Sequence, residues 1–184
     1  MATQKISLGE KLAFGAGDCG CNFVWNVLAL FMTIYYTDSV MISAAAVGGI
    51  MLASRIFDGI SDLVMGAILD KTKTRWGKAR PWILWSAPFM AIALILTFSV
   101  PDISEGKVIY AFCTYFFLTV IVYTASNLPY NALLSFITDD QKERTSLSSI
   151  RFFMVNFLVI ILSFVTPPAA KALGWFGITT IYGI

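Results

Sequence analysis

Long apolar runs alternate with short polar segments along the whole chain. A helix that crosses the hydrocarbon core of a bilayer needs about 20 mostly apolar residues. Five runs of that kind occur, and a sixth begins near Trp175 and is cut by the end of the chain. The predicted spans cover 12–36, 44–69, 82–100, 108–137, 147–170 and 175–184. The pattern predicts an all-α polytopic membrane protein, with 1–184 as one domain of about six transmembrane helices. Because a helix rarely ends inside a bilayer, we expect the chain to be a fragment of a longer protein.

The composition agrees with a bilayer environment and excludes several functions. Hydrophobic residues make up 58% of the chain and charged residues 13%, against about a quarter in soluble domains. The net charge of +2 is too small to predict a nucleic-acid partner. The absence of histidine excludes a Ser–His nucleophile pair. The sequence also lacks phosphate-loop, dinucleotide-binding and HExxH motifs, so we expect neither an enzyme nor a cofactor.

Basic residues are concentrated in alternate loops, which predicts the orientation. Nine of the 13 Lys and Arg residues precede the first span or lie between spans 2 and 3 or spans 4 and 5. They are Lys5, Lys11, Lys71, Lys73, Arg75, Lys78, Arg80, Lys142 and Arg144. The acidic residues of the other loops are Asp38, Asp102 and Glu105. Because basic loops stay on the inner side, we expect a cytoplasmic N-terminus and a protein of the cytoplasmic (inner) membrane.

Charged residues within the second span form the strongest candidate for chemistry. Arg55, Asp58 and Asp62 share one helical face, because spacings of three and four bring side chains together. Charges inside a membrane helix are costly and usually face the protein interior on an ion or proton pathway. Two carboxylates, with Ser61 or a neighbouring helix, can bind a hard cation through oxygen. Alternatively one carboxylate carries a proton, or Arg55 forms a salt bridge that only holds helices together.

The fourth and first spans carry amides and aromatic rings. Tyr123, Asn127, Tyr130 and Asn131 are expected near one face of span 4. Directed hydrogen bonds beside a flat apolar ring suit a sugar, although membrane helices also use such residues for packing. Span 1 has a matching pair of amides four residues apart, Asn22 and Asn26, together with an intramembrane charge and three glycines. These are Asp18, Gly15, Gly17 and Gly20.

Three further features are expected to hold or move the helices. Arg151 begins the fifth span and could reach either the Asp58/Asp62 pair or a substrate. Gly66, Asp70 and Arg75 belong to the loop after span 2, where Asp70 could pair with a cation and close a cytoplasmic gate. Two consecutive prolines are expected to disturb the end of span 5, Pro167 and Pro168.

Several short runs together resemble the major facilitator superfamily, and within it the glycoside–pentoside–hexuronide:cation symporters typified by melibiose permease. The matching residues occur in order over nearly the whole chain. They are Gly17, Asp18, Gly20 and Asn22; Tyr36, Thr37 and Asp38; Arg55, Asp58 and Asp62; Thr74 to Lys78 with Arg80, Pro81 and Trp82; and Arg151, Phe152 and Phe153. The segment from Gly66 to Lys78 resembles the loop between the second and third helices of the superfamily.

The resemblance implies twelve helices in two six-helix halves, of which this chain would be the first. The cation site would be formed by Asp58 and Asp62 with Ser61 and Thr124. Sugar contacts would come from Asn22, Tyr123, Asn127, Asn131 and Arg151. The implied function is symport of a sugar or glycoside with Na⁺, Li⁺ or H⁺ by alternating access. Asn22 and Asn127 replace acidic residues of melibiose permease, which leaves the sugar open. Alternatives are a carrier for another small solute, or a non-transporting membrane receptor or assembly subunit.

Overall fold

A computed structural model describes residues 6–102, 106–138 and 140–183, and within these ranges every regular element is a helix. The elements are α1 (Leu8–Ile34), η1 (Tyr35–Ser39), α2 (Ala44–Lys71), α3 (Arg80–Thr97), α4 (Lys107–Phe116), η2 (Phe117–Tyr123), α5 (Thr124–Ile137) and α6 (Gln141–Gly183). The two η elements are π-helices that continue the α-helices beside them. The all-α prediction is confirmed. Lys5, Glu105 and the end of the predicted sixth span at residue 184 lie outside the described residues.

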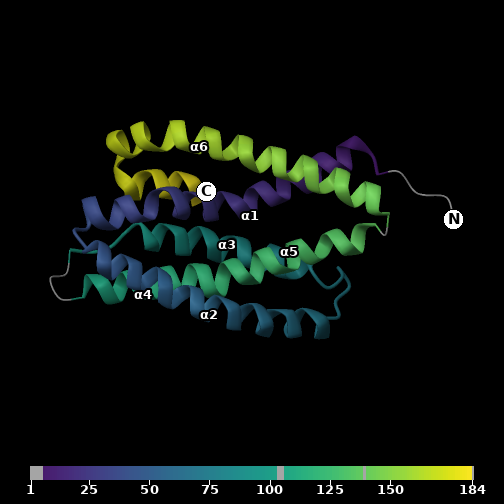
Figure 1. Ribbon diagram of the computed structural model, residues 1–184, viewed down its shortest axis with the longest axis horizontal. Coiled ribbons are helices and arrows are strands. Elements are labelled where there is room, and N and C mark those ends of the chain that lie inside the picture. The colour runs from purple at the N-terminus through teal and green to yellow at the C-terminus, as the bar shows by residue number, and fades with distance from the viewer. Residues whose placement is uncertain (1–5, 103–105, 139, 184) are drawn as a thin grey trace.

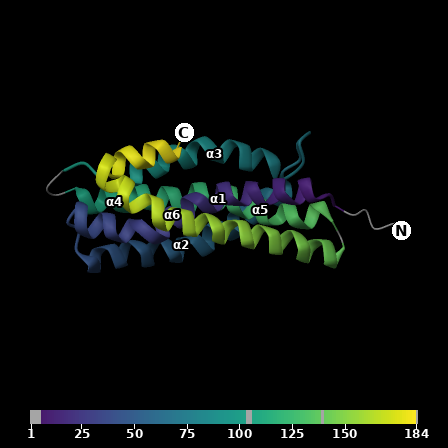
Figure 2. The same ribbon diagram turned by 90° about the horizontal axis from the view of Figure 1, so that it is seen from above.

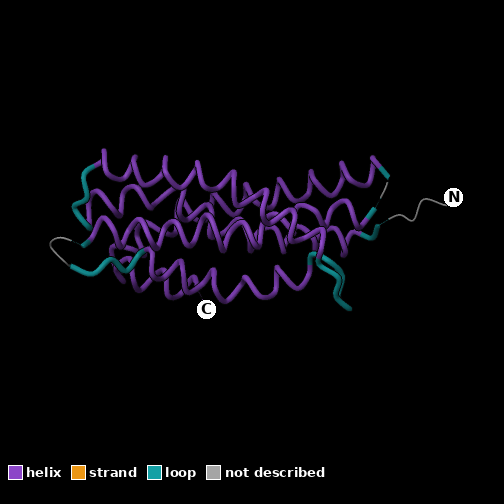
Figure 3. The backbone as a smooth tube through the Cα atoms, turned by 90° about the horizontal axis from the view of Figure 1, so that it is seen from below, coloured by secondary structure: helices purple, strands orange, loops and turns teal. Residues whose placement is uncertain are grey.

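The helices lie side by side along the longest axis of the molecule (Figure 1). The start of α1, the 72–79 loop and the start of α6 lie at one end of the bundle. The turn between η1 and α2, the end of α3 and the start of α4 lie at the opposite end (Figure 3). The loops that carry most of the basic residues therefore lie at the same end.

Most of these helices are long and apolar enough to cross a bilayer. Four qualify by length and composition: Leu8–Ser39, Arg80–Thr97, Lys107–Ile137 and Gln141–Gly183. Helix α2 is outside that set, and it carries Arg55, Asp58 and Asp62 along its middle. Its 28 residues nevertheless extend about 42 Å at 1.5 Å per residue, more than the roughly 30 Å of the hydrocarbon core.

Helix α6 contains a sharp bend, so that its last part returns along the bundle beside α1 and α3 (Figures 1 and 2). The bend is at Gly174, which has φ 74° and ψ 164°. Glycine adopts this backbone conformation readily, whereas residues with a Cβ would be strained in it. Pro167 and Pro168 lie inside the helical part that precedes it. The expected disturbance therefore occurs after the prolines. A hydrogen bond of 2.8 Å between the hydroxyls of Thr166 and Tyr182 joins the two arms.

The core lies between α1, α3, the α4–η2–α5 rod and α6. Its largest fully buried side chains include Met32, Tyr36, Leu94, Phe98 and Leu118. Glycines allow the closest approaches. A Cβ on Gly15 would lie 2.5 Å from the Met154 sulfur of α6, and one on Gly17 would lie 3.0 Å from the Tyr130 ring of α5. These two glycines therefore serve helix packing, which fixes α1 against the elements that carry the candidate site.

Candidate cation and sugar site

Asp58 lies at the centre of a small polar cluster that joins α2 to α5. Arg55 Nη1 is 3.3 Å from Asp58 Oδ2, one turn away on the same helix. Thr124 Oγ1 donates a hydrogen bond of 3.4 Å to the other carboxylate oxygen. The Ser61 hydroxyl lies 3.0 Å from the Asp58 backbone carbonyl and 3.3 Å from Thr124 Oγ1. The structure thus brings together side-chain oxygen atoms of Asp58, Ser61 and Thr124 that could serve as ligands of a cation.

Thr124 is placed by an irregular segment of its own rod. The π-helix η2 (Phe117–Tyr123) ends directly before it, and α5 starts at Thr124. A π-turn widens the helix and rotates the residues after it relative to those before it, and such segments recur at functional sites. Thr124 is 4% exposed and points at α2. The position of this hydroxyl therefore depends on the π-helical segment, which the apolar pattern of the span does not reveal.

Asp62 is not buried within the described bundle, contrary to the expectation for charges in a membrane helix. It is exposed, although its carboxylate contacts the Thr124 hydroxyl, and the Asp58 side chain keeps 25% of its surface. The reason is the packing of α2. Its buried residues form one stripe: Val47, Ile50, Ser54, Met65 and Leu69. Asp62 lies at the edge of this stripe, one turn beyond Asp58, so its carboxylate reaches Thr124 while the residue remains exposed.

A polar cavity of about 1020 Å³ lies beside this cluster, between α1, α5 and the long arm of α6. It contains all five residues predicted to bind a sugar. Its lining includes Asp18, Asn22, Trp25, Asn26, Tyr123, Asn127, Asn131, Arg151 and Asn156. Five of these side chains are asparagine amides, each of which offers hydrogen-bond donors and an acceptor. The cavity is therefore suited to a ligand that carries many hydroxyl groups.

Arg151 joins the three walls of this cavity. Its Nε lies 3.4 Å from a carboxylate oxygen of Asp18 on α1, and its Nη1 donates a 2.9 Å hydrogen bond to Asn131 Oδ1 on α5. The Asn131 amide in turn donates 2.8 Å to Asn127 Oδ1. Arg151 lines the cavity and, among the described residues, forms no ion pair with Asp58 or Asp62, so its contact with a substrate stays a prediction. Asp18 was expected as a structural charge, and its side chain is only 6% exposed.

Trp25 connects the cavity to the carboxylate cluster and was missed in the sequence. Its ring stacks on Tyr123 with centroids 5.0 Å apart and planes at 27°. The Arg55 guanidinium lies 4.6 Å from the centroid of the same ring, close enough for a cation–π interaction. The Trp25 ring therefore contacts both Arg55, which pairs with Asp58, and Tyr123, which lines the cavity. Its spacing of three residues from Asn22 is a signal that could have found it, because that spacing lies on one helical face.

Tyr130 does not share the face of the other span 4 residues. It is buried between α5 and α1, stacks on Phe14 with a centroid separation of 5.2 Å and donates a hydrogen bond to the Phe14 carbonyl. The two amides of span 1 do line the cavity. Asn22 donates 3.1 Å to the Asp18 carbonyl, and Asn26 donates 2.8 Å to the Asn22 carbonyl. These bonds to backbone carbonyls fix the orientation of the two amides through their nitrogens, and the side-chain oxygens do not take part in them.

The predicted gating residues lie at the loop end of the bundle, away from the cavity. Asp70 is exposed and forms no ion pair with a described residue. Arg75 lies over its neighbour Trp76, 4.9 Å from the ring centroid. A Cβ on Gly66 would meet no atom within 4 Å. The structure therefore leaves the gating role of Gly66, Asp70 and Arg75 a prediction.

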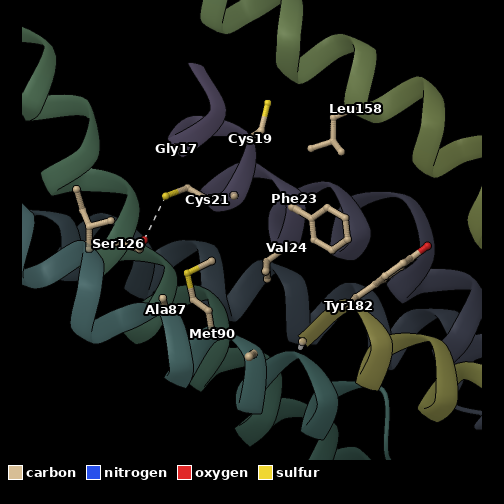
Figure 4. Close-up of a pocket in the computed structure, with 14 residues that line it drawn as sticks. Gly17, Cys19, Cys21, Phe23, Val24, Ala87, Met90, Ser126, Leu158 and Tyr182 are labelled. Atoms are coloured by element: carbon tan, nitrogen blue, oxygen red, sulfur yellow. Dashed lines mark hydrogen bonds between the residues drawn. The ribbon is translucent and has the colours of Figure 1, made fainter. Parts of the chain in front are cut away.

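A second cavity of about 530 Å³ lies on another side of α1 and is mostly apolar (Figure 4). Phe23, Val24 and Met90 form much of its lining. Its clearest polar feature is a 3.3 Å hydrogen bond between Cys21 Sγ and Ser126 Oγ, which satisfies both groups within the protein. The larger cavity with its amides is therefore the better candidate for a polar ligand. Among the described residues, no group of three or more His, Cys, Asp or Glu side chains could hold a metal ion.

Comparison with known proteins identifies the family. Residues 13–182 match the model of the family described as "MFS/sugar transport protein". The chain is 42% identical over 157 residues to the inner membrane symporter YicJ of Escherichia coli, covering 85% of this chain and 34% of the relative. It is 35% identical over 189 residues to the isoprimeverose transporter of Lactiplantibacillus pentosus, covering 97% and 39%.

A third relative is the glucuronide carrier protein homolog of Escherichia coli, 34% identical over 170 residues, with 91% of this chain and 37% of the relative covered. The chain thus spans between about a third and two fifths of the length of these curated relatives. It has the apolar helices of an integral membrane protein, and the family consists of transporters. The chain belongs to the major facilitator superfamily of sugar transport proteins, among the glycoside–pentoside–hexuronide:cation symporters.

Proposed function

We propose that the full-length protein is a secondary active transporter that couples entry of a cation to symport of a sugar or glycoside. One observation carries the proposal. Thr124, which hydrogen-bonds Asp58, directly follows Tyr123, which lines the amide-rich cavity. A cation cluster and a sugar cavity therefore meet at two consecutive residues of one helix rod. The named activities of the relatives agree with this chemistry.

The cation would bind between α2 and α5. Carboxylate oxygens of Asp58 and Asp62 and hydroxyl oxygens of Ser61 and Thr124 are the ligand type that a hard cation prefers. The two carboxylates are balanced by one cation of the protein, Arg55, at 3.3 Å from Asp58. A monovalent ion would complete the charge balance of the cluster. Na⁺, Li⁺ and H⁺ all satisfy that requirement.

The sugar would bind in the polar cavity. Asn22, Asn127 and Asn131 would hydrogen-bond its hydroxyls, and Arg151 would add a charged donor. The stacked rings of Trp25 and Tyr123 provide an apolar surface for the face of the sugar ring. A volume of about 1020 Å³ is at the upper end of the roughly 300–1,000 Å³ typical of small-molecule sites. There is room for a glycoside as well as a monosaccharide.

Coupling would pass through Arg55 and Trp25. Arg55 contacts Asp58 through its charge and Trp25 through its planar face. A cation that binds to Asp58 weakens the hold of that carboxylate on Arg55, because the two positive charges compete for it. The Trp25 ring, which stacks on Tyr123, would respond to the same event. If the cation raises sugar affinity by this route, the sugar would raise cation affinity by the same factor, because linkage is reciprocal.

The complete protein would have twelve helices in two halves, with the sugar held between them. Rocking of the halves would expose the site to each side in turn. We place the protein in the inner membrane with the N-terminus and the 71–80 loop in the cytoplasm, because the basic loops lie at one end of the bundle. Gly66, Asp70 and Arg75 would then form part of a cytoplasmic gate.

The experiment that tests the proposal is uptake by the purified full-length protein in proteoliposomes. Radiolabelled glycosides and monosaccharides are offered with an inward gradient of Na⁺, Li⁺ or H⁺, one at a time. We expect accumulation above the external concentration with at least one cation, and its collapse when an ionophore dissipates that gradient. A receptor or assembly subunit would bind sugar without accumulating it, and that result would refute the proposal.

A further inference from the structure

An apolar groove with aromatic walls lies on the outer surface between α3 and the η2–α5 segment. Its volume is about 560 Å³. The side chains that line it are Thr72, Thr74, Pro81, Trp82, Trp85, Ser86, Phe89, Phe117, Ile121, Val122 and Ala125. Several of these are large and exposed, with Trp85 at 68% and Phe89 at 50%. An uncovered aromatic groove on a membrane-spanning helix is open to the acyl chains of the bilayer.

The few polar groups in the groove are already satisfied by the protein. Thr72 Oγ1 accepts a 3.1 Å bond from the Trp82 indole and donates 2.8 Å to the Ile68 carbonyl. Ser86 donates 3.1 Å to the Ile83 carbonyl. Thr74 donates 2.7 Å to the carbonyl of Gly77. The interior of the groove therefore offers no free polar partner and suits a hydrocarbon chain.

The mouth of the groove, at the loop end of the bundle, is bordered by positive charges. Lys71 and Lys73 are the chain neighbours of Thr72, and Arg75 follows Thr74. Arg80 precedes Pro81. Consecutive Cα atoms are 3.8 Å apart, so these four exposed side chains start within one residue of the lining. None of the four forms an ion pair with a carboxylate of the described part of the chain. They are available to an external anion.

We infer that this groove and its basic border form a binding site for an anionic phospholipid. One acyl chain lies along Trp82, Trp85 and Phe89, and the phosphate lies among Lys71, Lys73 and Arg75. The inference goes beyond the proposed transport function, because none of these residues lines the polar cavity or the carboxylate cluster. Arg75 alone is shared with the proposed cytoplasmic gate. Charge complementarity selects the occupant: clusters of basic residues at the end of a membrane helix recognise acidic headgroups. A zwitterionic lipid would fill the groove without using the border.

Native mass spectrometry of the detergent-purified full-length protein tests the site. Phosphatidylglycerol and phosphatidylcholine with identical acyl chains are titrated separately, and the apparent dissociation constant of the first bound lipid is compared. We expect tighter binding of phosphatidylglycerol by at least ten-fold. The triple variant Lys71→Gln, Lys73→Gln, Arg75→Gln should lose about five-fold in phosphatidylglycerol affinity per charge removed, until the two lipids bind alike. Lys142→Gln, a basic residue at the start of α6, is the control and should leave both affinities unchanged.

A second pair of variants tests the groove apart from the border. Trp85→Ala with Phe89→Ala should weaken both lipids by a similar factor and keep the preference for phosphatidylglycerol. Leu84→Ala is the matched control, since Leu84 is 62% exposed on the same helix but does not line the groove. Equal affinity of the wild type for the two lipids would overturn the inference. So would a triple variant that behaves like Lys142→Gln, or groove variants that behave like Leu84→Ala.

Discussion

The ion pair between Asp18 and Arg151 permits a quantitative test of how the polar cavity is held together. The guanidinium Nε and the carboxylate oxygen are 3.4 Å apart, and the side chains keep 25% and 6% of their surface. Asp18→Asn removes the negative charge and leaves Arg151 partly buried without its counter-charge. Arg151→Gln leaves the opposite charge, which is more deeply buried. The two single variants therefore break the same ion pair but leave behind charges that are buried to different extents.

The magnitude follows from burial. Removing one partner of a buried ion pair costs about 3–5 kcal/mol, mostly because the remaining charge is uncompensated. Arg151 is a quarter exposed and keeps its 2.9 Å bond to Asn131, so Asp18→Asn should cost about 3 kcal/mol, the lower end of that range. Arg151→Gln strands a carboxylate that is only 6% exposed and should cost about 5 kcal/mol, the upper end. The double variant, with no charge left, should cost much less than the sum.

A double-mutant cycle on the full-length protein measures this coupling, with unfolding by a chaotrope in mixed micelles as the assay. The pair Lys107 and Asp102 is the matched control, because it has the same 3.4 Å separation but an Asp102 side chain that is 99% exposed. Its coupling should be about 0–1 kcal/mol. If Asp18→Asn and Arg151→Gln were additive within about 0.5 kcal/mol, the two groups would be independent and the reasoning would fail.

Three further outcomes are expected. Asn127→Ala should weaken sugar binding by about 1–3 kcal/mol and leave cation affinity nearly unchanged, because it removes a hydrogen-bond partner outside the carboxylate cluster; unchanged affinity for every transported sugar would assign Asn127 to packing. Trp25→Leu should reduce the increase in sugar affinity that the cation causes, and should change the affinity for the cation itself less. Sugar titrations with and without the cation measure this increase, and an equal increase in variant and wild type would exclude Trp25 from coupling. On a cysteine-free background in intact cells, an impermeant thiol reagent should label Asp102→Cys and spare Lys73→Cys, and the reverse pattern would invert the proposed topology.

Much of the fold could be predicted because it depends on local patterns. Apolar runs of the length of a bilayer define helices regardless of what they pack against. The alternation of basic loops likewise requires no tertiary information, and the structure puts those loops at one end of the bundle. The predicted neighbourhood of Asn127 and Asn131 follows from helical spacing, and the 2.8 Å bond between their amides shows it. All of these features follow from the order of residues along one segment and need no knowledge of how the helices pack.

The features that were missed depend on contacts between helices. Spacing could not tell that Arg151 would meet Asp18 on α1, since the choice depends on how α6 crosses α1. The exposure of Asp62 follows from which stripe of α2 is buried. The spacing of Trp25 from Asn22 places the two on one helical face, but its contacts with Arg55 and Tyr123 require the positions of α2 and the α5 rod. Each of these needs the relative position of two or more helices.

In the proposed mechanism the carboxylates of α2 couple the cation to sugar movement. The most direct measurement compares sugar accumulation and sugar exchange by full-length Asp58→Cys and Asp62→Cys in proteoliposomes. Loss of the anionic ligands of a hard cation should abolish cation-driven accumulation in both variants, while exchange of labelled for unlabelled sugar without a cation gradient survives. If both variants accumulated sugar with the cation dependence of the wild type, the cation would bind elsewhere and the account would be wrong.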